Sequence, residues 1–229
     1  ATSIALDLSC WRVAGIGGDM IRYHILEDFA ERFAASGFDS RAFTASYGMA
    51  ETTLAISFVP LGSGIQTDTI DLRILETQDI ASPSNDPSQM LRTFVICGEV
   101  LPGHELEIRD SDGKVVKDRQ LGTIFVRGPS LMQGYFRQPQ ETAKVVDADG
   151  WLNTGDLGYM LDGQVVITGR AKDLIIINGR NIWPQDLEWS AETEIASLRS
   201  RDVAVFSVDE SEGEKIVALV QCRATTPEA

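Results

Sequence analysis

The chain has 229 residues, of which 43% are hydrophobic and 24% charged, so it carries enough apolar material for one large domain or two smaller ones. Its formal net charge of -14 repels phosphate backbones, and we expect no nucleic-acid partner. Three cysteines, few and far apart, argue against a disulfide framework or a zinc cluster and indicate a reducing, cytoplasmic location. The sequence contains no apolar run long enough for an integral membrane segment.

The first part of the chain has the pattern of an α/β sheet. Residues 10–14 (CWRVA) and 42–46 predict two buried strands. Between them a helix is expected over residues 19–36, because apolar residues recur every four positions, at Ile21, Ile25, Phe29 and Phe33. A second helix is expected to follow the second strand, before residue 58. Ligands bind at the carboxyl ends of such strands, where the strings GIGG and YGMAE lie.

Residues 93–169 change to short strands separated by turns, which predicts a small antiparallel barrel or sandwich. Hairpins are expected to turn at Asp112-Gly113 and Asp162-Gly163, with a strand over residues 122–128 between them. The segment at about 60–92 is rich in Asp, Ser, Thr and Pro. It predicts an insertion whose end, residues 81–89, is disordered or mobile.

A third block begins at Arg170. Residues 173–178 predict a strand, and Pro184 opens a helix expected to run to about Leu198, since proline is tolerated in the first turn. Residues 203–208 and 215–222 predict two further strands. A helix over a few strands is typical of a small α+β unit.

Glu51 is the first candidate functional residue. It is the only charge between Arg41 and Asp68, so a carboxylate stands where the chain is expected to enter the interior. An isolated buried carboxylate is costly unless it is paired, hydrogen-bonded or bound to a cation. Further charged residues lie in glycine-flanked turns, Asp156 in NTGDLG and Arg170 with Lys172 in TGRAKD.

Four strings, in this order, resemble the core motifs of the adenylate-forming superfamily, which comprises acyl-CoA synthetases, peptide-synthetase adenylation domains and luciferases. They are YGMAETT, GEVLPGHELEIRD, GTIFVRGPSLMQGYF and GWLNTGDLGYMLDGQVVITGRAKDLIIINGRNIWPQDLE. Within that superfamily, GRNIWPQDLE and LSCWRVAGIGGDMI are similar to strings of the fatty acyl-AMP ligases. The segment at about 60–92 falls where these ligases carry an insertion that coenzyme A synthetases lack.

The resemblance implies an α/β fold. Residues 1–169 would be the C-terminal part of the large adenylation domain, with parallel sheet strands, a small β-barrel and the insertion at about 60–92. Residues 170–229 would form the start of the small α+β C-terminal domain, which would be truncated. The family's Ser/Thr/Gly-rich phosphate loop and its C-terminal catalytic lysine have no counterpart in the sequence. We therefore expect an internal to C-terminal part of a larger ligase, inactive by itself.

The resemblance also implies an activity. Such ligases use ATP and Mg²⁺ to convert a fatty acid to acyl-AMP and pyrophosphate, then pass the acyl group to the phosphopantetheine thiol of an acyl carrier protein, in polyketide, lipopeptide or lipid pathways. Two alternatives stay open. One is a fatty acyl-CoA synthetase, and the other is a non-catalytic module that keeps the fold to bind a nucleotide or a partner.

The matched positions receive roles from the resemblance. Glu51 would be the magnesium ligand, Asp156 would accept hydrogen bonds from the ribose hydroxyls, and Arg170 would reach the ribose or phosphates. Lys172 would act at the hinge of the small domain, and Gly179 would approach the pantetheine arm. The remaining expected nucleotide-pocket residues are Gly17, Gly18, Asp19, Tyr47 and Gly48, with Tyr47 against the adenine.

Simpler explanations compete with these roles. Glu51 could have no role beyond a favourable interaction with a helix dipole, and Asp156 no role beyond forming a turn. GIGG could serve simply as a tight connection between a strand and a helix. Met20 and Trp183 depart from the family, which usually has proline and tyrosine there, so the acyl pocket and the nearby loop are expected to differ.

Overall fold

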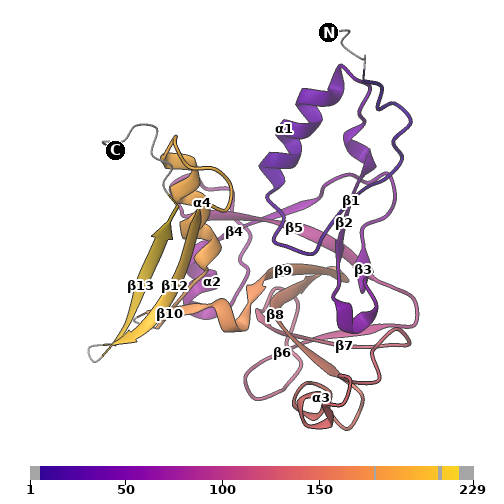
Figure 1. Ribbon diagram of the computed structural model, residues 1–229, viewed down its shortest axis with the longest axis vertical. Helices are drawn as coiled ribbons and strands as arrows, with labels where there is room; N and C mark the ends of the chain where they lie inside the picture. Colours follow the sequence, from indigo (N-terminus) through magenta and orange to yellow (C-terminus); the bar gives the residue numbers. More distant parts are fainter. Residues whose placement is uncertain (1–5, 178, 211–212, 222–229) are drawn as a thin grey trace. The chain divides into compact units, whose positions relative to one another are not determined.

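The computed structural model describes residues 6–177, 179–210 and 213–221 (Figure 1). The chain divides into two compact units between Thr168 and Gly169, one residue before the boundary predicted from the sequence. The assignment of these units to a large and a small domain of the family stays a prediction.

The first unit contains one parallel strand pair. β1 (Ala14–Ile16) runs beside β2 (Phe43–Tyr47), with Ala14 opposite Phe43 and Ile16 opposite Ala45. The predicted strand at 10–14 was placed too early, because the chain first makes a turn in which the Trp11 amide donates to the Leu8 carbonyl at 3.0 Å. The predicted pair of strands therefore forms, but β1 begins at Ala14, four residues after the predicted start at residue 10.

Helix α1 (Tyr23–Ala34) connects the two parallel strands. It is shorter at both ends than the predicted helix over 19–36. Its apolar side carries Phe29 and Phe33, which pack with Phe38 and Phe43 in a cluster of aromatic rings, with Phe29 and Phe38 centroids 5.1 Å apart. Of the residues in the predicted four-residue spacing, Phe29 and Phe33 thus face the sheet, whereas Ile25 is exposed and Leu26 packs against the cluster.

The second helix predicted after β2 was wrong. The chain makes a single 3-10 turn, η2 (Ala50–Thr52), and then enters β3 (Ser57–Phe58), which is antiparallel to β2. Thr53 has a φ of 71°, a left-handed conformation that a continuing helix does not allow. This turn leaves Glu51 close to the end of β2.

The segment predicted as an insertion contains a strand and a helix. β4 (Thr67–Asp71) pairs with β5 (Leu91–Val100), and α2 (Leu72–Gln78) starts at Asp71, whose side chain accepts hydrogen bonds from two amides of the first turn. Residues 82–84 return along β4, where the Ser84 amide donates to the Thr69 carbonyl at 3.1 Å. Residues 82–84 of the predicted mobile end are thus paired with β4, and the mobility of the other residues in 81–89 stays a prediction.

The remaining strands extend this sheet. β6 (Glu105–Arg109), β7 (Gly122–Arg127), β8 (Leu152–Leu161) and β9 (Gln164–Arg170) are antiparallel to their neighbours, and α3 (Pro139–Val145) lies between β7 and β8 in the sequence. The order is β1-β2-β3-β5-β9-β8-β7-β6, with β4 also on β5. Among the described residues β5 and β6 do not pair, so residues 93–169 do not close into the predicted barrel and instead belong to an open mixed sheet. The turn at Asp112-Gly113 leads only to an isolated bridge.

The second unit is a small α+β unit, as predicted. β10 (Ile175–Ile177) and β11 (Arg180–Ile182) form a hairpin, α4 (Pro184–Glu194) follows, and β12 (Val203–Glu210) pairs with β13 (Gly213–Val220). Its core holds Ile175, Val203 and Val205. Asn178, part of the predicted strand over 173–178, and residue 222, the end of the last predicted strand, lie outside the described residues. The helix ends four residues before the predicted Leu198.

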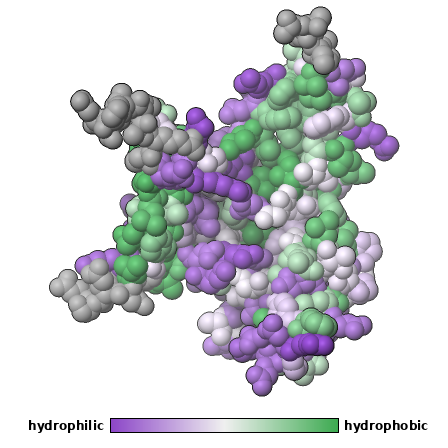
Figure 2. Space-filling model, viewed as in Figure 1, coloured by the Kyte–Doolittle hydropathy of each residue, from purple (hydrophilic) through white to green (hydrophobic). Residues whose placement is uncertain are grey.

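Exposed apolar side chains occur in both units (Figure 2). In the first unit they include Trp11, Val13 and Ile25, near β1 and on α1, which are between 45% and 51% exposed. None of the helices in the described part of the chain combines the length and the apolar character that a membrane crossing needs.

A buried carboxylate ties the segment containing β4 to the sheet. Asp68 accepts a hydrogen bond from the Tyr159 hydroxyl at 2.7 Å and an ion pair from Arg119 at 3.0 Å. Burial and the bond to Asp68 raise the pKa of the Tyr159 phenol, so it remains a donor. Removal of either partner of a buried charge leaves the other uncompensated.

We predict that Asp68→Ala lowers the free energy of unfolding by about 2–4 kcal/mol, because Arg119 and Tyr159 lose their shared acceptor. Urea denaturation of the variant measures the change. Asp112→Ala is the matched control, since this turn carboxylate is exposed, and it should change stability by less than about 0.5 kcal/mol. Equal effects of the two substitutions would contradict the prediction.

Candidate functional site

The two glycine-containing strings meet at one edge of the sheet. Gly17, Gly18 and Asp19 follow β1, and Tyr47 and Gly48 lie at the end of β2, so the parallel pairing brings both to the carboxyl ends of the strands. A Cβ on Gly17 would lie 2.8 Å from the Ser46 carbonyl, which is closer than real contacts allow. Glycine is therefore required here by the neighbouring strand.

Gly48 is also required by the chain itself. A Cβ at this position would come within 1.8 Å of the Leu54 carbonyl oxygen. The chain folds back on itself after Tyr47, where the Ile56 amide donates to the Tyr47 carbonyl at 2.8 Å. The glycine permits this close return, and the sequence had suggested only an approach to a ligand.

Tyr47 and Asp156 join the two best-defined strings through a buried hydrogen bond. The Tyr47 hydroxyl donates to Asp156 Oδ2 at 2.7 Å, and the two residues are 8% and 7% exposed. They are separated by 109 positions in the chain. The structure thus brings together two of the predicted nucleotide-pocket residues.

A β-bulge aims Asp156 at this contact. The register between β7 and β8 shifts near Ile124, opposite the TGD string. Thr154 Oγ1 donates to the Ile124 carbonyl at 2.9 Å and accepts from the Asp156 amide, and Gly155 has a φ of 72°. Bulges with a left-handed glycine turn a side chain out of its regular direction, which explains the TGD sequence physically.

Glu51 lies in the 3-10 turn after β2 and is half-buried, so the expectation of an interior carboxylate was too strong. Its Oε1 accepts a hydrogen bond from the Tyr135 hydroxyl at 2.8 Å. Its backbone carbonyl accepts from the Met132 amide at 2.7 Å. Sequence reasoning did not identify Tyr135 as a partner, although it lies in the quoted string GTIFVRGPSLMQGYF.

The fit of Glu51 to magnesium follows from its donor atoms. Among the residues that the structure describes, no group of three or more His, Cys, Asp or Glu side chains could hold a metal ion. Mg²⁺ is commonly bound by one or two carboxylates together with water and substrate phosphates. Glu51, with Oε1 on Tyr135, therefore fits a magnesium site that is completed by a nucleotide.

The other predicted residues belong to the second unit. Arg170 ends β9, Lys172 lies exposed in the 3-10 turn η3 (Ala171–Asp173), and Gly179 has a φ of 75° in the turn between β10 and β11. Trp183, the departure from the family pattern, is 1% exposed, and a Cβ on Gly169 would lie 2.8 Å from its ring. The roles of these residues toward a nucleotide stay predictions.

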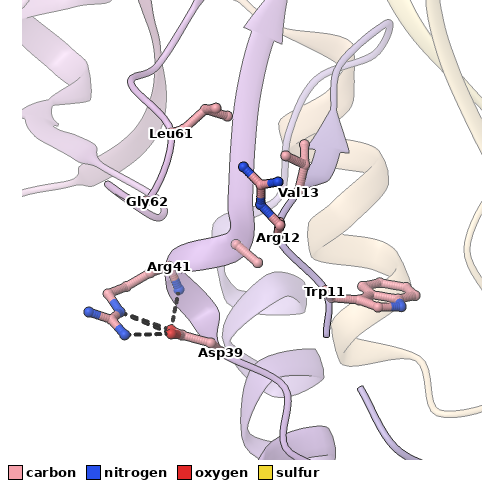
Figure 3. Close-up of a pocket in the computed structure, with 8 residues that line it drawn as sticks. Trp11, Arg12, Val13, Asp39, Arg41, Leu61 and Gly62 are labelled. Atoms are coloured by element: carbon pink, nitrogen blue, oxygen red, sulfur yellow. Dashed lines mark hydrogen bonds and ion pairs between the residues drawn. The ribbon is translucent and has the colours of Figure 1, made fainter. Parts of the chain in front are cut away.

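A separate hollow of about 330 Å³ lies at the opposite, amino ends of the parallel pair (Figure 3). Trp11, Arg12 and Val13 precede β1, while Asp39 and Arg41 precede β2 and form an ion pair at 2.6 Å. Ligands of such sheets bind at the carboxyl ends, so this hollow is distinct from the candidate site.

Comparison with known proteins establishes the family. The sequence model of the AMP-binding enzyme family matches residues 2–136, more than half of the chain. The chain belongs to the AMP-binding enzyme family. The predicted membership of the adenylate-forming superfamily is thereby confirmed.

Members of the AMP-binding family with similar sequences have names of two kinds. A Caulobacter vibrioides protein, provisionally named an acyl-CoA synthetase, is 54% identical over 95% of this chain and 38% of its own length. The medium-chain-fatty-acid--[acyl-carrier-protein] ligase JamA of Moorena producens is 37% identical over 94% of this chain and 38% of its own. The chain spans well under half the length of these relatives.

Solved structures of AMP-binding enzymes are also similar to this chain. One from a study of fatty acyl-adenylate ligases of E. coli and L. pneumophila is 47% identical, with a TM-score of 0.89 over 97% of this chain and 40% of its own. An L. pneumophila fatty acyl-adenylate ligase in complex with acyl adenylate and pyrophosphate is 33% identical, with a TM-score of 0.69 over 93% of this chain and 38% of its own. Fatty acyl-adenylate ligases are thus among the family members that this chain resembles strongly.

The contact with Glu51 predicts a measurable property of Tyr135. The hydrogen bond to the carboxylate raises the pKa of the phenol above its ordinary value of 10.0. The contact therefore stabilises the folded state below pH 10, and this contribution is lost as the pH rises through the raised pKa. We predict that Glu51→Gln returns the titration midpoint toward 10, as measured by NMR of ring-labelled tyrosine.

Tyr135→Phe assigns the signal in that experiment. Glu105→Gln is the control, because this carboxylate is paired with Arg127 and not with a tyrosine. A midpoint that shifts equally in Glu51→Gln and Glu105→Gln would show that general charge, and not the hydrogen bond, sets the Tyr135 pKa.

Proposed function

We propose that the protein containing this chain activates a fatty acid with ATP, forming acyl-AMP and pyrophosphate, and then transfers the acyl group to the phosphopantetheine thiol of an acyl carrier protein. The observation that carries the proposal is the meeting of Tyr47, Glu51 and Asp156 around the carboxyl end of β2. It occurs in a chain 47% identical to a structure from the fatty acyl-adenylate ligase study.

Three residues of the first unit would act on the nucleotide. Asp156 would accept hydrogen bonds from the ribose hydroxyls, a charge-assisted contact that its buried position strengthens. Tyr47, held by Asp156, would border the adenine, with Gly17, Gly18 and Asp19 on the neighbouring strand end. Gly48 would shape the turn between them.

Glu51 would hold Mg²⁺ through its carboxylate, with Gly48 and the 3-10 turn setting its place after β2. When bound, the cation supplies charge screening between the phosphates and the attacking carboxylate of the fatty acid. Arg170 would reach the ribose or phosphates, Lys172 would lie at the hinge of the small domain, and Gly179 would border the pantetheine arm.

A fatty acyl-CoA synthetase is the second candidate, and a specific observation favours it. The Caulobacter vibrioides relative at 54% identity is provisionally named an acyl-CoA synthetase. The ordered segment with β4 and α2 favours the carrier-protein ligase, because it falls where the fatty acyl-AMP ligases carry their insertion. JamA and the Teredinibacter turnerae relative TtuA are both named acyl-carrier-protein ligases.

We predict that the full-length protein, given ATP and a medium-chain or long-chain fatty acid, accumulates acyl-AMP and transfers the acyl group at least about tenfold faster to a holo-carrier protein than to coenzyme A. Chromatography of acyl-AMP and mass spectrometry of the two products measure both steps. Equal or faster transfer to coenzyme A would overturn the assignment. Nucleotide binding without acyl-AMP would favour the non-catalytic module.

The 229-residue chain by itself is expected to be inactive, because the family's phosphate loop and C-terminal lysine have no counterpart in its sequence. ATP-pyrophosphate exchange with a fatty acid tests this, and exchange by the isolated chain would refute it. We also propose a cytoplasmic location, since the described cysteines Cys10 and Cys97 are free thiols.

A further inference from the structure

The turn that carries Glu51 is fastened to one other segment, residues 130–135. The Met132 amide donates to the Glu51 carbonyl at 2.7 Å, and Thr53 Oγ1 donates to the Ser130 carbonyl at 3.1 Å. The third contact, from the Tyr135 hydroxyl, reaches the carboxylate itself at 2.8 Å. The backbone of the turn and the end of the Glu51 side chain are thus held by the same neighbouring segment.

The backbone of Tyr135 is itself held by a hydrogen bond to α3. Its amide donates to Thr142 Oγ1 at 2.9 Å, and that hydroxyl donates in turn to the Gln138 carbonyl before α3. Gly134 has a φ of 145°, and a Cβ there would lie 2.9 Å from Thr142 Oγ1. Thr142 and Gly134 therefore set the direction in which the chain presents Tyr135.

A half-exposed glutamate needs such a partner if its carboxylate is to hold one orientation. A free Glu side chain samples many rotamers, and fixing it costs conformational entropy when a ligand binds. A phenol that donates to one carboxylate oxygen limits those rotamers beforehand. Loss of a partner that orients a metal ligand in this way typically costs about 10–100-fold in metal affinity.

We propose that Tyr135 is a positioning residue for Glu51: its hydroxyl holds the carboxylate in the orientation that binds the divalent cation of the nucleotide. This inference rests on the proposed function, because the cation role of Glu51 does. Tyr135 acts through Glu51 and not on the substrate. Its substitution should therefore weaken cation binding while the affinity for the fatty acid stays unchanged.

The test uses the full-length protein with a non-hydrolysable ATP analogue and Mn²⁺ as the probe, read by electron paramagnetic resonance. Tyr135→Phe should raise the apparent Kd for Mn²⁺ by about tenfold, as expected for loss of an orienting partner. Tyr23→Phe is the matched control, because Tyr23 lies in α1, where its ring contacts His24. It should leave the Kd unchanged.

A double-substitution cycle separates positioning from a general structural effect. In a Glu51→Gln background, Tyr135→Phe should cause no further loss of Mn²⁺ affinity, since no carboxylate remains to be oriented. An unchanged Kd in Tyr135→Phe, or an equal loss with and without Glu51, would overturn the proposal.

Two further measurements keep the outcome interpretable. Glu51→Asp keeps a carboxylate but shortens its reach to Tyr135, so the variant should lose Mn²⁺ affinity by a similar factor. This variant remains informative even if Tyr135→Phe folds poorly. Wild-type Mn²⁺ affinity in Glu51→Asp would count against the positioning role of Tyr135.

Acyl-AMP formation is measured separately. A protein that makes no acyl-AMP yet shows the coupling between Tyr135 and Glu51 would refute the proposed function and leave the positioning role supported.

Discussion

The buried hydrogen bond between Tyr47 and Asp156 is the constraint on which the candidate site depends. The two residues lie on β2 and β8, and in the sheet order β3, β5 and β9 lie between them. In a flat sheet four strand spacings would separate these strands by roughly 19 Å, far beyond the reach of a tyrosine side chain. The 2.7 Å contact therefore requires the sheet to curl strongly around its own core.

The hydrophobic core confirms this curl. A single buried cluster contains residues from six different strands and from the segment before β3, namely Tyr47, Ile56, Cys97, Ile108, Ile124, Val126, Leu152 and Val165. Burial in this cluster raises the pKa of the Cys97 thiol to about 12, as expected for a thiol inside an apolar core. The barrel expected for residues 93–169 is therefore wrong, and the core is instead enclosed by an open sheet that also includes β2.

Local chemistry made much of the fold predictable. The Asp162-Gly163 turn joins β8 and β9 as the sequence indicated, and Pro184 opens α4. The errors arise where distant residues decide the structure. Residues 82–84 lie in a segment that looks mobile by composition but pair with β4. The turn after β2 stops at Thr53 because the chain there must reach β3.

The candidate site, too, was predictable only in part from the sequence. The sequence named Tyr47, Glu51 and Asp156, because each stands in a string whose residue types are specific. It could not give the contact between Glu51 and Tyr135, which are 84 positions apart. It placed Gly17 and Gly48 in the expected nucleotide pocket, with a tight backbone connection as the alternative for Gly17, and the structure shows that the protein's own backbone already excludes a side chain at both positions.

The two carboxylates of the site differ in what they contribute to the fold. Asp156 is 7% exposed and accepts a hydrogen bond from Tyr47 that helps to offset the cost of burying its charge, so we expect changes there to affect folding and ligand binding together. Glu51 is half-buried, so hydration removes the need for a cation to explain its presence. The proposed cation at Glu51 is therefore supported by the orientation of its carboxylate by Tyr135 and by the family. Because Glu51 is less buried than Asp156, we expect substitutions at Glu51 to change ligand binding with a smaller effect on stability than substitutions at Asp156.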